Sequence, residues 1–355
     1  MRLALSTTLA TALSTAFTPD LLSLLTPTAR VSTRMSTVTE VGALAEALEV
    51  NSGVTSIHLT TWGFGGIDQE GIEALAESLK VHGTISHLCL EGFLTGNGQL
   101  CFDCTAALAE AIKVNRVLTD VSLRGNGIGA RGAAALARAL MVNSTVTSID
   151  LKENELRDAG VGAMAEALRV NCTVTYINLG RNQVGVQGAR SLAEALQMNH
   201  TIAAIILDYN QIGDEGFCAL AEAMKFNNTV CRLDVSSNRA GDQGKRALGE
   251  ALMENSSVTK LDVGNNSFAD WGDAAMIRLL RNTQTLTDIG LGRNLLGDDN
   301  AVDLAAVLKV NRTLRVVNLQ HVGIGPCSAS DLAEALAPGA PQTLRQVSHP
   351  SPQHA

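Results

Sequence analysis

Apolar and polar positions follow two different periods within a stretch of 28 residues, and this stretch repeats along the chain. In the first half of residues 146–173, apolar and polar residues alternate, as in Ile149-Asp-Leu151. Period two predicts a short strand with one buried face. In the second half, as in Ala163-Met-Ala-Glu-Ala-Leu168, apolar residues recur at helical spacing with Glu on the outer side. This spacing predicts an amphipathic helix.

An aspartate precedes the predicted helix in several repeats, for example Asp158, Asp214 and Asp270. A carboxylate in this place can accept hydrogen bonds from the first N–H groups of a helix. We therefore expect each aspartate to cap the helix that follows it.

Three ladders of residues keep the 28-residue step. A ladder of marker asparagines lies where each strand becomes a loop: Asn126, Asn154, Asn182, Asn210, Asn238, Asn266 and Asn294. Glycines keep the same step from Gly132 to Gly272, and large apolar residues keep it from Leu136 to Leu332. A period of this length indicates a solenoid, in which stacked repeats bury the apolar side that one repeat leaves open. We expect each marker asparagine to bond the backbone of its turn and to stack on the next one.

The pattern resembles the leucine-rich repeat, L-x-x-L-x-L-x-x-N-x-I/L followed by a full α-helix, over roughly residues 36–337. With its G-x-x-G and A-L-A-E-A-L motifs, the 28-residue repeat is most similar to the ribonuclease-inhibitor-like class. That class includes the repeat regions of NOD-like receptors and Ran GTPase-activating proteins. The resemblance implies an α/β fold: a curved solenoid, or horseshoe, with parallel strands on the concave face and α-helices on the convex face.

The period divides the chain into four parts. Residues 1–35 form a presequence or disordered tail, 36–53 a capping helix with no strand before it, 54–340 one domain of about ten repeats, and 341–355 a polar tail. Residues 1–34 are rich in Ser and Thr, with Arg2, Arg30 and Arg34 against Asp20. They therefore resemble a plastid or secretory targeting segment. Without targeting, we expect the protein in the cytoplasm.

Composition excludes several classes of partner. The net charge is −8 and no cluster of Lys and Arg occurs, whereas binding to a phosphate backbone needs basic surface, so no nucleic-acid partner is expected. The apolar run from Leu3 to Phe17 is too short to span a bilayer. The expected protein is a monomer without a membrane span or cofactor.

Cysteines supply one motif of interest. Cys101-Phe-Asp-Cys104 is a CxxC pair, but a structural zinc site needs two more ligands, and the sequence has no second such pair. We expect no metal site and leave the role of Cys101 and Cys104 open.

Sequons recur at the ends of the predicted helices, at Asn143, Asn171, Asn199, Asn227, Asn255 and Asn311. We interpret them as turn chemistry of the repeat. A glycan at several of them would instead place the protein in the secretory pathway.

No motif pairs a nucleophile with a base, and no phosphate-binding loop occurs, so we expect no catalysis. The alternating strands place one column of residues on the inner face, where aspartates make it acidic. Tyrosine and arginine commonly anchor protein interfaces. We predict that a protein partner binds this face and the loop rim through Asp150, Lys152, Tyr176, Arg181, Asp208, Tyr209, Asp234 and Asp262.

Two alternatives come from the resemblance alone. One is a GTPase activator similar to the Ran GTPase-activating proteins, which carry an acidic C-terminal segment, whereas residues 342–355 contain no acid. The other is a ribonuclease inhibitor-like regulator, against which the sparse Cys and Trp content argues.

Overall fold

The chain of the computed structural model divides into two compact units, Met1–Asn178 and Leu179–Ala355, called here the N-terminal and C-terminal units. Each unit is described by itself. The structure describes residues 29–34, 38–50, 52–60, 69–92, 102–266, 274–335 and 346–348.

In the described part of the N-terminal unit, strands and helices alternate as β1 (Ala29–Arg34), α3 (Val38–Val50), β2 (Val54–Thr60), α4 (Gln69–Val81), β3 (His87–Glu91), α5 (Phe102–Val114), β4 (Asp120–Ser122), α6 (Gly129–Leu140), β5 (Ser148–Asp150), α7 (Arg157–Val170) and β6 (Tyr176–Asn178). The strands pair in chain order, and every described pairing is parallel. From β4 onward, the register sets residues one repeat apart side by side, such as Ile149 beside Ile177.

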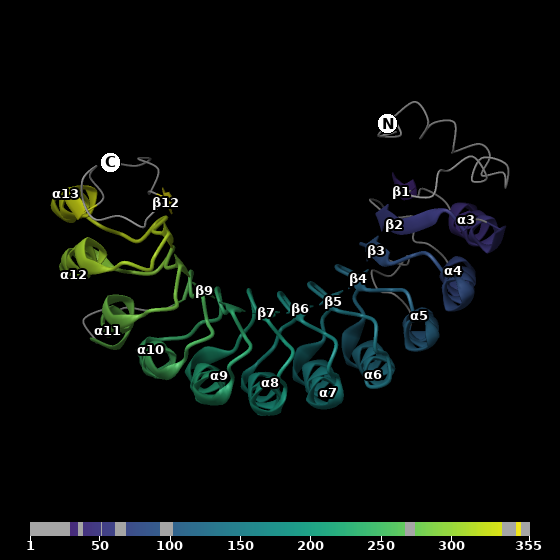
Figure 1. Cartoon of the computed structure of the whole chain (residues 1–355), viewed down its shortest axis with the longest axis horizontal. Coiled ribbons are helices and arrows are strands. Elements are labelled where there is room, and N and C mark those ends of the chain that lie inside the picture. Colours follow the sequence, from purple (N-terminus) through teal and green to yellow (C-terminus); the bar gives the residue numbers. More distant parts are fainter. Residues whose placement is uncertain are drawn as a thin grey trace. The chain divides into compact units, whose positions relative to one another are not determined.

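The C-terminal unit continues the alternation with α8 (Val186–Met198), β7 (Ala204–Ile206), α9 (Gly213–Phe226), β8 (Arg232–Asp234), α10 (Asp242–Glu254), β9 (Lys260–Asp262), α11 (Ala274–Asn282), β10 (Asp288–Gly290), α12 (Gly297–Val310), β11 (Val316–Asn318), α13 (Pro326–Ala335) and β12 (Gln346–Ser348). Its strands also pair in chain order and in parallel. Within each unit, strands line one side and helices the other (Figure 1). The predicted α/β solenoid is therefore confirmed.

The core lies between the strands and helices of each unit. Ile149 and Leu151 of one repeat are fully buried, as are Met164 and Leu168 of its helix. Each repeat presents the same apolar residues to its neighbours, so the core is continuous along each unit.

The marker asparagines join consecutive repeats through buried hydrogen bonds. Asn154 Oδ1 accepts the N–H of Asn126 at 3.0 Å, and its Nδ2 donates to the carbonyl of Leu123 at 2.8 Å. Asn266 accepts the N–H of Asn238 at 3.0 Å in the same way. Residues beside these asparagines, such as Glu153, have positive φ. The short polar side chain thus satisfies backbone groups that a left-handed turn leaves without strand partners.

A second asparagine ladder ends the helices. Asn227 is typical: its Nδ2 donates to the carbonyls of Leu196 (2.8 Å) and Asn199 (3.1 Å), and its Oδ1 accepts the N–H groups of Thr229 and Val230. The ladder consists of Asn115, Asn143, Asn171, Asn199, Asn227, Asn255 and Asn311, all buried. Six of these seven are the sequon asparagines. Their amide groups are therefore engaged in repeat stacking, which supports the interpretation as turn chemistry.

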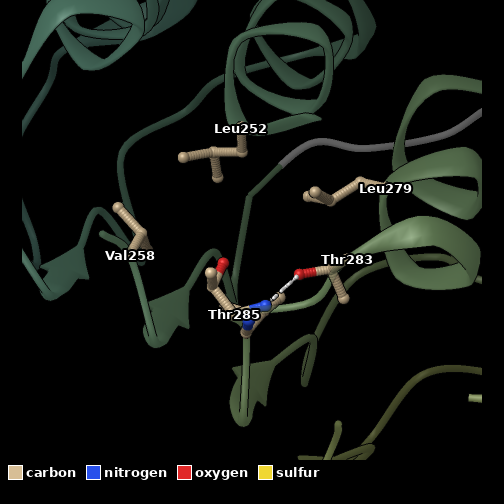
Figure 2. Close-up of a pocket in the computed structure, with 6 residues that line it drawn as sticks. Leu252, Val258, Leu279, Thr283 and Thr285 are labelled. Atoms are coloured by element: carbon tan, nitrogen blue, oxygen red, sulfur yellow. Dashed lines mark hydrogen bonds between the residues drawn. The ribbon is translucent and has the colours of Figure 1, made fainter. Parts of the chain in front are cut away.

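The repeat of α11 lacks this asparagine, as does the repeat of α4, where His82 stands in its place. In the repeat of α11, Thr283 stands in its place, and its Oγ1 accepts the N–H of Leu286 at 3.0 Å but cannot supply the two amide donors. A narrow crevice without room for a water molecule remains beside it, lined in part by Leu252, Val258 and Leu279 (Figure 2). The ladder asparagines donate to carbonyls 31 and 28 residues earlier. An asparagine at position 283 would therefore donate to the carbonyls of Leu252 and Asn255.

Thr283→Asn is expected to raise the free energy of unfolding by about 1 kcal/mol, because it adds hydrogen bonds of the kind that each contribute about that amount. Urea denaturation followed by circular dichroism measures the change. Thr283→Ser keeps the acceptor without the donors and should give no gain. If Thr283→Asn is no more stable than Thr283→Ser, the absence of the asparagine does not weaken the packing of the repeats.

The glycine ladder marks close approach between consecutive helices. A Cβ built on Gly160 of α7 would lie 3.1 Å from Ala130 Cα of α6, and one on Gly244 of α10 would lie 2.8 Å from Phe217 Cβ of α9. A side chain at either position would push the helices apart, so glycine allows their close spacing.

The expectation for the helix-capping aspartates is wrong. Helix α7 has no side-chain cap, and Asp214 lies inside the first turn of its own helix α9. Asp214 Oδ1 instead accepts the N–H groups of Gly241 (2.8 Å) and Gly244 (2.7 Å) at the start of α10. The aspartate caps the helix of the next repeat, because stacked helix ends lie side by side. Asp270 is outside the described residues.

Two strands lie outside the predicted repeats. β1 falls within residues 1–35 and precedes the helix that was expected to start the fold, and β12 falls within the predicted tail 341–355. Each adds one more parallel strand, to β2 and β11 respectively. The remainder of the predicted presequence, residues 1–28 and 35, is outside the described residues.

Candidate protein-binding face

The side of each sheet that points away from the helices is called here the strand face. One predicted column of this face runs through His58, Cys89, Ser122, Asp150 and Asn178 in the N-terminal unit, in register on neighbouring strands. The corresponding column of the C-terminal unit is Ile206, Asp234, Asp262, Gly290 and Asn318.

The strand face of the C-terminal unit contains an open groove of about 280 Å³ across β8 to β11. Asp234, Asp262 and Gly290 line it from the predicted column, and Arg232, Lys260 and Asp288 from the next column. Gly290 leaves the space that the Asp262 side chain fills, since a Cβ there would lie 2.5 Å from its carboxylate carbon. The groove therefore has carboxylates on its floor and two cations beside them.

The floor carboxylates are difficult to ionise. Burial raises the pKa of Asp262 from 3.8 to about 6, and the neighbouring Asp234 adds to the effect. Burial also raises the pKa of Asp234, although Ser236 donates to its carboxylate from both Oγ (2.7 Å) and N–H (3.1 Å). Asp208 repels both groups. At neutral pH the groove thus holds negative charge that a cationic group would stabilise.

Asp262→Asn is expected to stabilise the fold by about 1 kcal/mol at neutral pH, because it removes a carboxylate that burial disfavours. The folded pKa lies above the ordinary 3.8, so the contribution of Asp262 is favourable below that value and is lost as the pH rises through about 6. The advantage of the variant should therefore vanish towards pH 4, roughly the ordinary pKa of an aspartate. Urea denaturation of both proteins across this range measures it. A difference that does not change with pH would contradict the assignment.

Arg181 and Tyr209 stand beside the groove in the C-terminal unit. The guanidinium of Arg181 lies 4.2 Å from the centroid of the Tyr209 ring, and Tyr209 is 46% exposed. Both residues have positive φ, and the N–H of Tyr209 donates to the carbonyl of Ser236, next to Asp234. Two side chains of the kinds that anchor protein interfaces are thus held in a stacked, exposed arrangement.

The other predicted site residues fall in two groups. Asp150, Lys152 and Tyr176 belong to the N-terminal unit, where Asp150 accepts hydrogen bonds from the N–H of Lys152 (2.8 Å) and from Asn178 Nδ2 (3.0 Å). Asp208 belongs to the C-terminal unit and is only 7% exposed. It can therefore contribute negative charge near the groove but offers a partner little surface to contact.

Sequence reasoning missed several groove residues. The predicted site residues do not include Arg232, Lys260, Asp288 and Gly290. The sequence does contain a signal for Gly290. A glycine within a column of polar residues leaves space that the side chain on the neighbouring strand can occupy. Of the CxxC pair, Cys104 is buried, and Cys101 lies outside the described residues.

Within the described ranges, no helix combines the length and apolar character needed to cross a membrane.

Comparison with protein families matches the profile described as "Leucine Rich repeat" at residues 114–137, 142–165, 170–193 and 199–221. Comparison with curated protein sequences gave no significant match. Among solved structures, an internalin from Listeria monocytogenes is similar, with 12% identity and a TM-score of 0.51, over 97% of this chain and 95% of that chain. The leiomodin-1 actin-binding site 2 matches 42% of this chain and 86% of that chain, with 21% identity and a TM-score of 0.35.

The matched profiles identify leucine-rich repeats between residues 114 and 221, and the stacked strand–helix architecture is the fold of leucine-rich repeat proteins. Proteins of this kind generally act as protein-binding modules and are typically non-catalytic. The ribonuclease-inhibitor-like class stays a prediction.

Proposed function

We propose that this chain is a non-catalytic protein-binding module whose partner contacts the strand face of the C-terminal unit. The groove across β8 to β11 carries the proposal, because Asp234 and Asp262 lie on its floor although burial disfavours their charge. Groups kept in an unfavourable state usually serve a site rather than the fold. The exposed stack of Arg181 on Tyr209 adds an anchor beside it.

Charge complementarity indicates the chemistry of the partner. An arginine or lysine side chain entering the groove would meet the two floor carboxylates and relieve their mutual repulsion. Arg232 and Lys260, both exposed at the same groove, are placed to contact acidic groups flanking that side chain. The proposed partner is therefore a protein that presents a basic side chain between acidic or polar neighbours.

The double variant Asp234→Asn, Asp262→Asn tests the proposal. The partner is first captured from the native source on the full chain and identified, and the purified pair is then measured by calorimetry. We expect about tenfold weaker binding, because the charge of the floor is lost without a change of shape. Since both replacements remove repulsion, the variant should remain folded.

The matched control is Glu194→Gln, Glu222→Gln, which removes the same charge from exposed positions on α8 and α9. It should bind as the unmodified chain does. Equal affinity of the groove variant and this control would place the partner elsewhere.

The remaining expectations belong to this proposal. We take the protein to act as a monomer in the cytoplasm, unless residues 1–34 direct it to a plastid or the secretory route. GTPase activation and ribonuclease inhibition stay predictions from the resemblance, and no contact in the described residues favours either over simple binding.

A further inference from the structure

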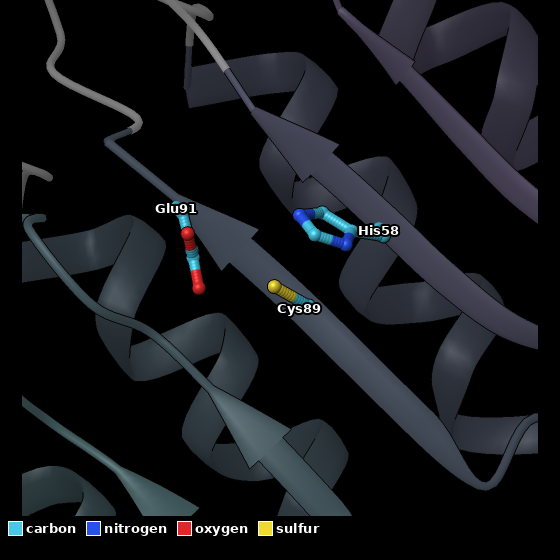
Figure 3. A group of neighbouring side chains, drawn as sticks. All are labelled: His58, Cys89 and Glu91. Atoms are coloured by element: carbon cyan, nitrogen blue, oxygen red, sulfur yellow. The ribbon is translucent and has the colours of Figure 1, made fainter.

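Three side chains with metal-binding atoms meet on the strand face of the N-terminal unit. His58 on β2 is the register partner of Cys89 on β3, and Glu91 lies two residues beyond Cys89 on the same side of that strand. One ligand atom from each lies within 4.8 Å of the other two. Figure 3 shows the imidazole and the carboxylate on either side of the Cys89 sulfur.

The backbone holds this group firmly. β2 and β3 pair through five consecutive register positions, from Ser56 beside His87 to Thr60 beside Glu91. The alternate residues, such as Ile57 and Leu88, are buried on the helix side. Ser122 of β4 also lies close, with its Oγ 3.4 Å from a carboxylate oxygen of Glu91. Two paired strands and a third neighbour thus fix the direction of all three ligands.

The donor set selects the class of ion. Imidazole nitrogen, thiolate sulfur and carboxylate oxygen together suit zinc, a borderline-soft dication, more than calcium or magnesium, which prefer oxygen alone. Zinc ligands lie at about 2.0–2.3 Å from the ion, so the side chains need only rotamer adjustments to close on it. A thiolate and a carboxylate also balance the charge of a dication.

We propose that His58, Cys89 and Glu91 bind one zinc-class dication and leave one coordination position open towards the solvent. Three protein ligands and an open position distinguish this arrangement from closed structural zinc sites. The proposal does not depend on the protein-binding groove, which lies in the other unit. It departs from the expectation that the chain has no metal site.

The sequence concealed the site for a physical reason. Its ligands come from neighbouring strands, and His58 and Cys89 are 31 residues apart, a step that departs from the regular period. A short motif such as CxxC reveals metal ligands only when the ligands lie close together in the sequence, within one turn or helix. Here the sheet register, not the local spacing, brings them together.

Titration of the full-length protein with Co²⁺ as the probe tests the site, because a cobalt–thiolate bond gives a charge-transfer absorption band. We expect one equivalent of Co²⁺ to produce the band and Zn²⁺ to displace it. Cys89→Ser should abolish the band, and His58→Ala and Glu91→Gln should each weaken Co²⁺ binding by at least about tenfold. Circular dichroism checks that each variant is folded.

Two controls separate this site from other thiols. Cys172→Ser removes an exposed thiol of the same unit, and Cys101→Ser removes the first cysteine of the CxxC pair. Both should keep the band at its original intensity. A band that survives in folded Cys89→Ser, a band lost in Cys101→Ser, or no band in the unmodified protein would each overturn the proposal.

Discussion

Asn154→Ala is expected to lower the free energy of unfolding by about 3 kcal/mol, because it leaves several buried backbone groups without partners at about 1–3 kcal/mol each. Asn154 is fully buried, and its Oδ1 accepts the N–H groups of Asn126 (3.0 Å) and Ile128 (3.4 Å). Its Nδ2 donates to the carbonyl of Leu123. Alanine can replace none of these bonds. Urea denaturation followed by circular dichroism measures the loss.

The control for this prediction is Gln284→Ala. Gln284 is exposed, and its Nε2 donates to the carbonyl of Asn282 at 3.1 Å at the surface. Replacement should change the free energy of unfolding by less than about 0.5 kcal/mol. If the two variants lose similar stability, the marker asparagines do not hold the repeats together.

Tyr209→Ala is expected to weaken binding of the captured partner by about 2 kcal/mol, the effect typical of a tyrosine anchor in an interface. Tyr209 is 46% exposed and its ring is held by Arg181, so a partner can bury it with little further loss of conformational freedom. Calorimetry of the purified pair measures the change, with unmodified chain and variant at the same salt concentration.

Phe226→Ala supplies the matched control for Tyr209. Phe226 lies at the end of α9, on the helix side of the same unit, and is 66% exposed. Removal of this exposed ring should leave the affinity unchanged. A loss of affinity in Phe226→Ala but not in Tyr209→Ala would move the interface to the helices.

The fold could be predicted in detail because each repeat has the same pattern of apolar and polar residues. Alternation around Ile149 and helical spacing around Leu168 define one strand–helix module, and the constant 28-residue step sets the register of successive modules. Where the period is interrupted, prediction weakens. β1 and β12 carry no repeat signal, because an outer strand can pair through backbone groups alone.

The second asparagine ladder could be interpreted from the sequence as turn chemistry, but its role in joining consecutive repeats could not. The asparagines from Asn143 to Asn255 keep the 28-residue step, and Thr283 interrupts it. Burial and the bonds of Asn227 to the preceding repeat show that these asparagines also join consecutive repeats. Burial at the helix end could not be inferred from polarity, because a buried asparagine and an exposed one look alike in the sequence.

The candidate site was predictable only in part. The alternation placed Asp234 and Asp262 in one column, and the register confirms this. Their raised pKa values depend on burial and on the approach of Asp208, which require coordinates. The meeting of His58 and Cys89 likewise follows from strand pairing across an irregular step.

Amide hydrogen exchange of the full chain, with and without the purified partner, tests the central claim most directly. The strand face of the C-terminal unit is the proposed interface, so protection should appear in the strand-end segments 206–211, 232–238 and 260–266. Protection confined to the helix segments 217–226 and 245–254, with those strand ends unchanged, would contradict it.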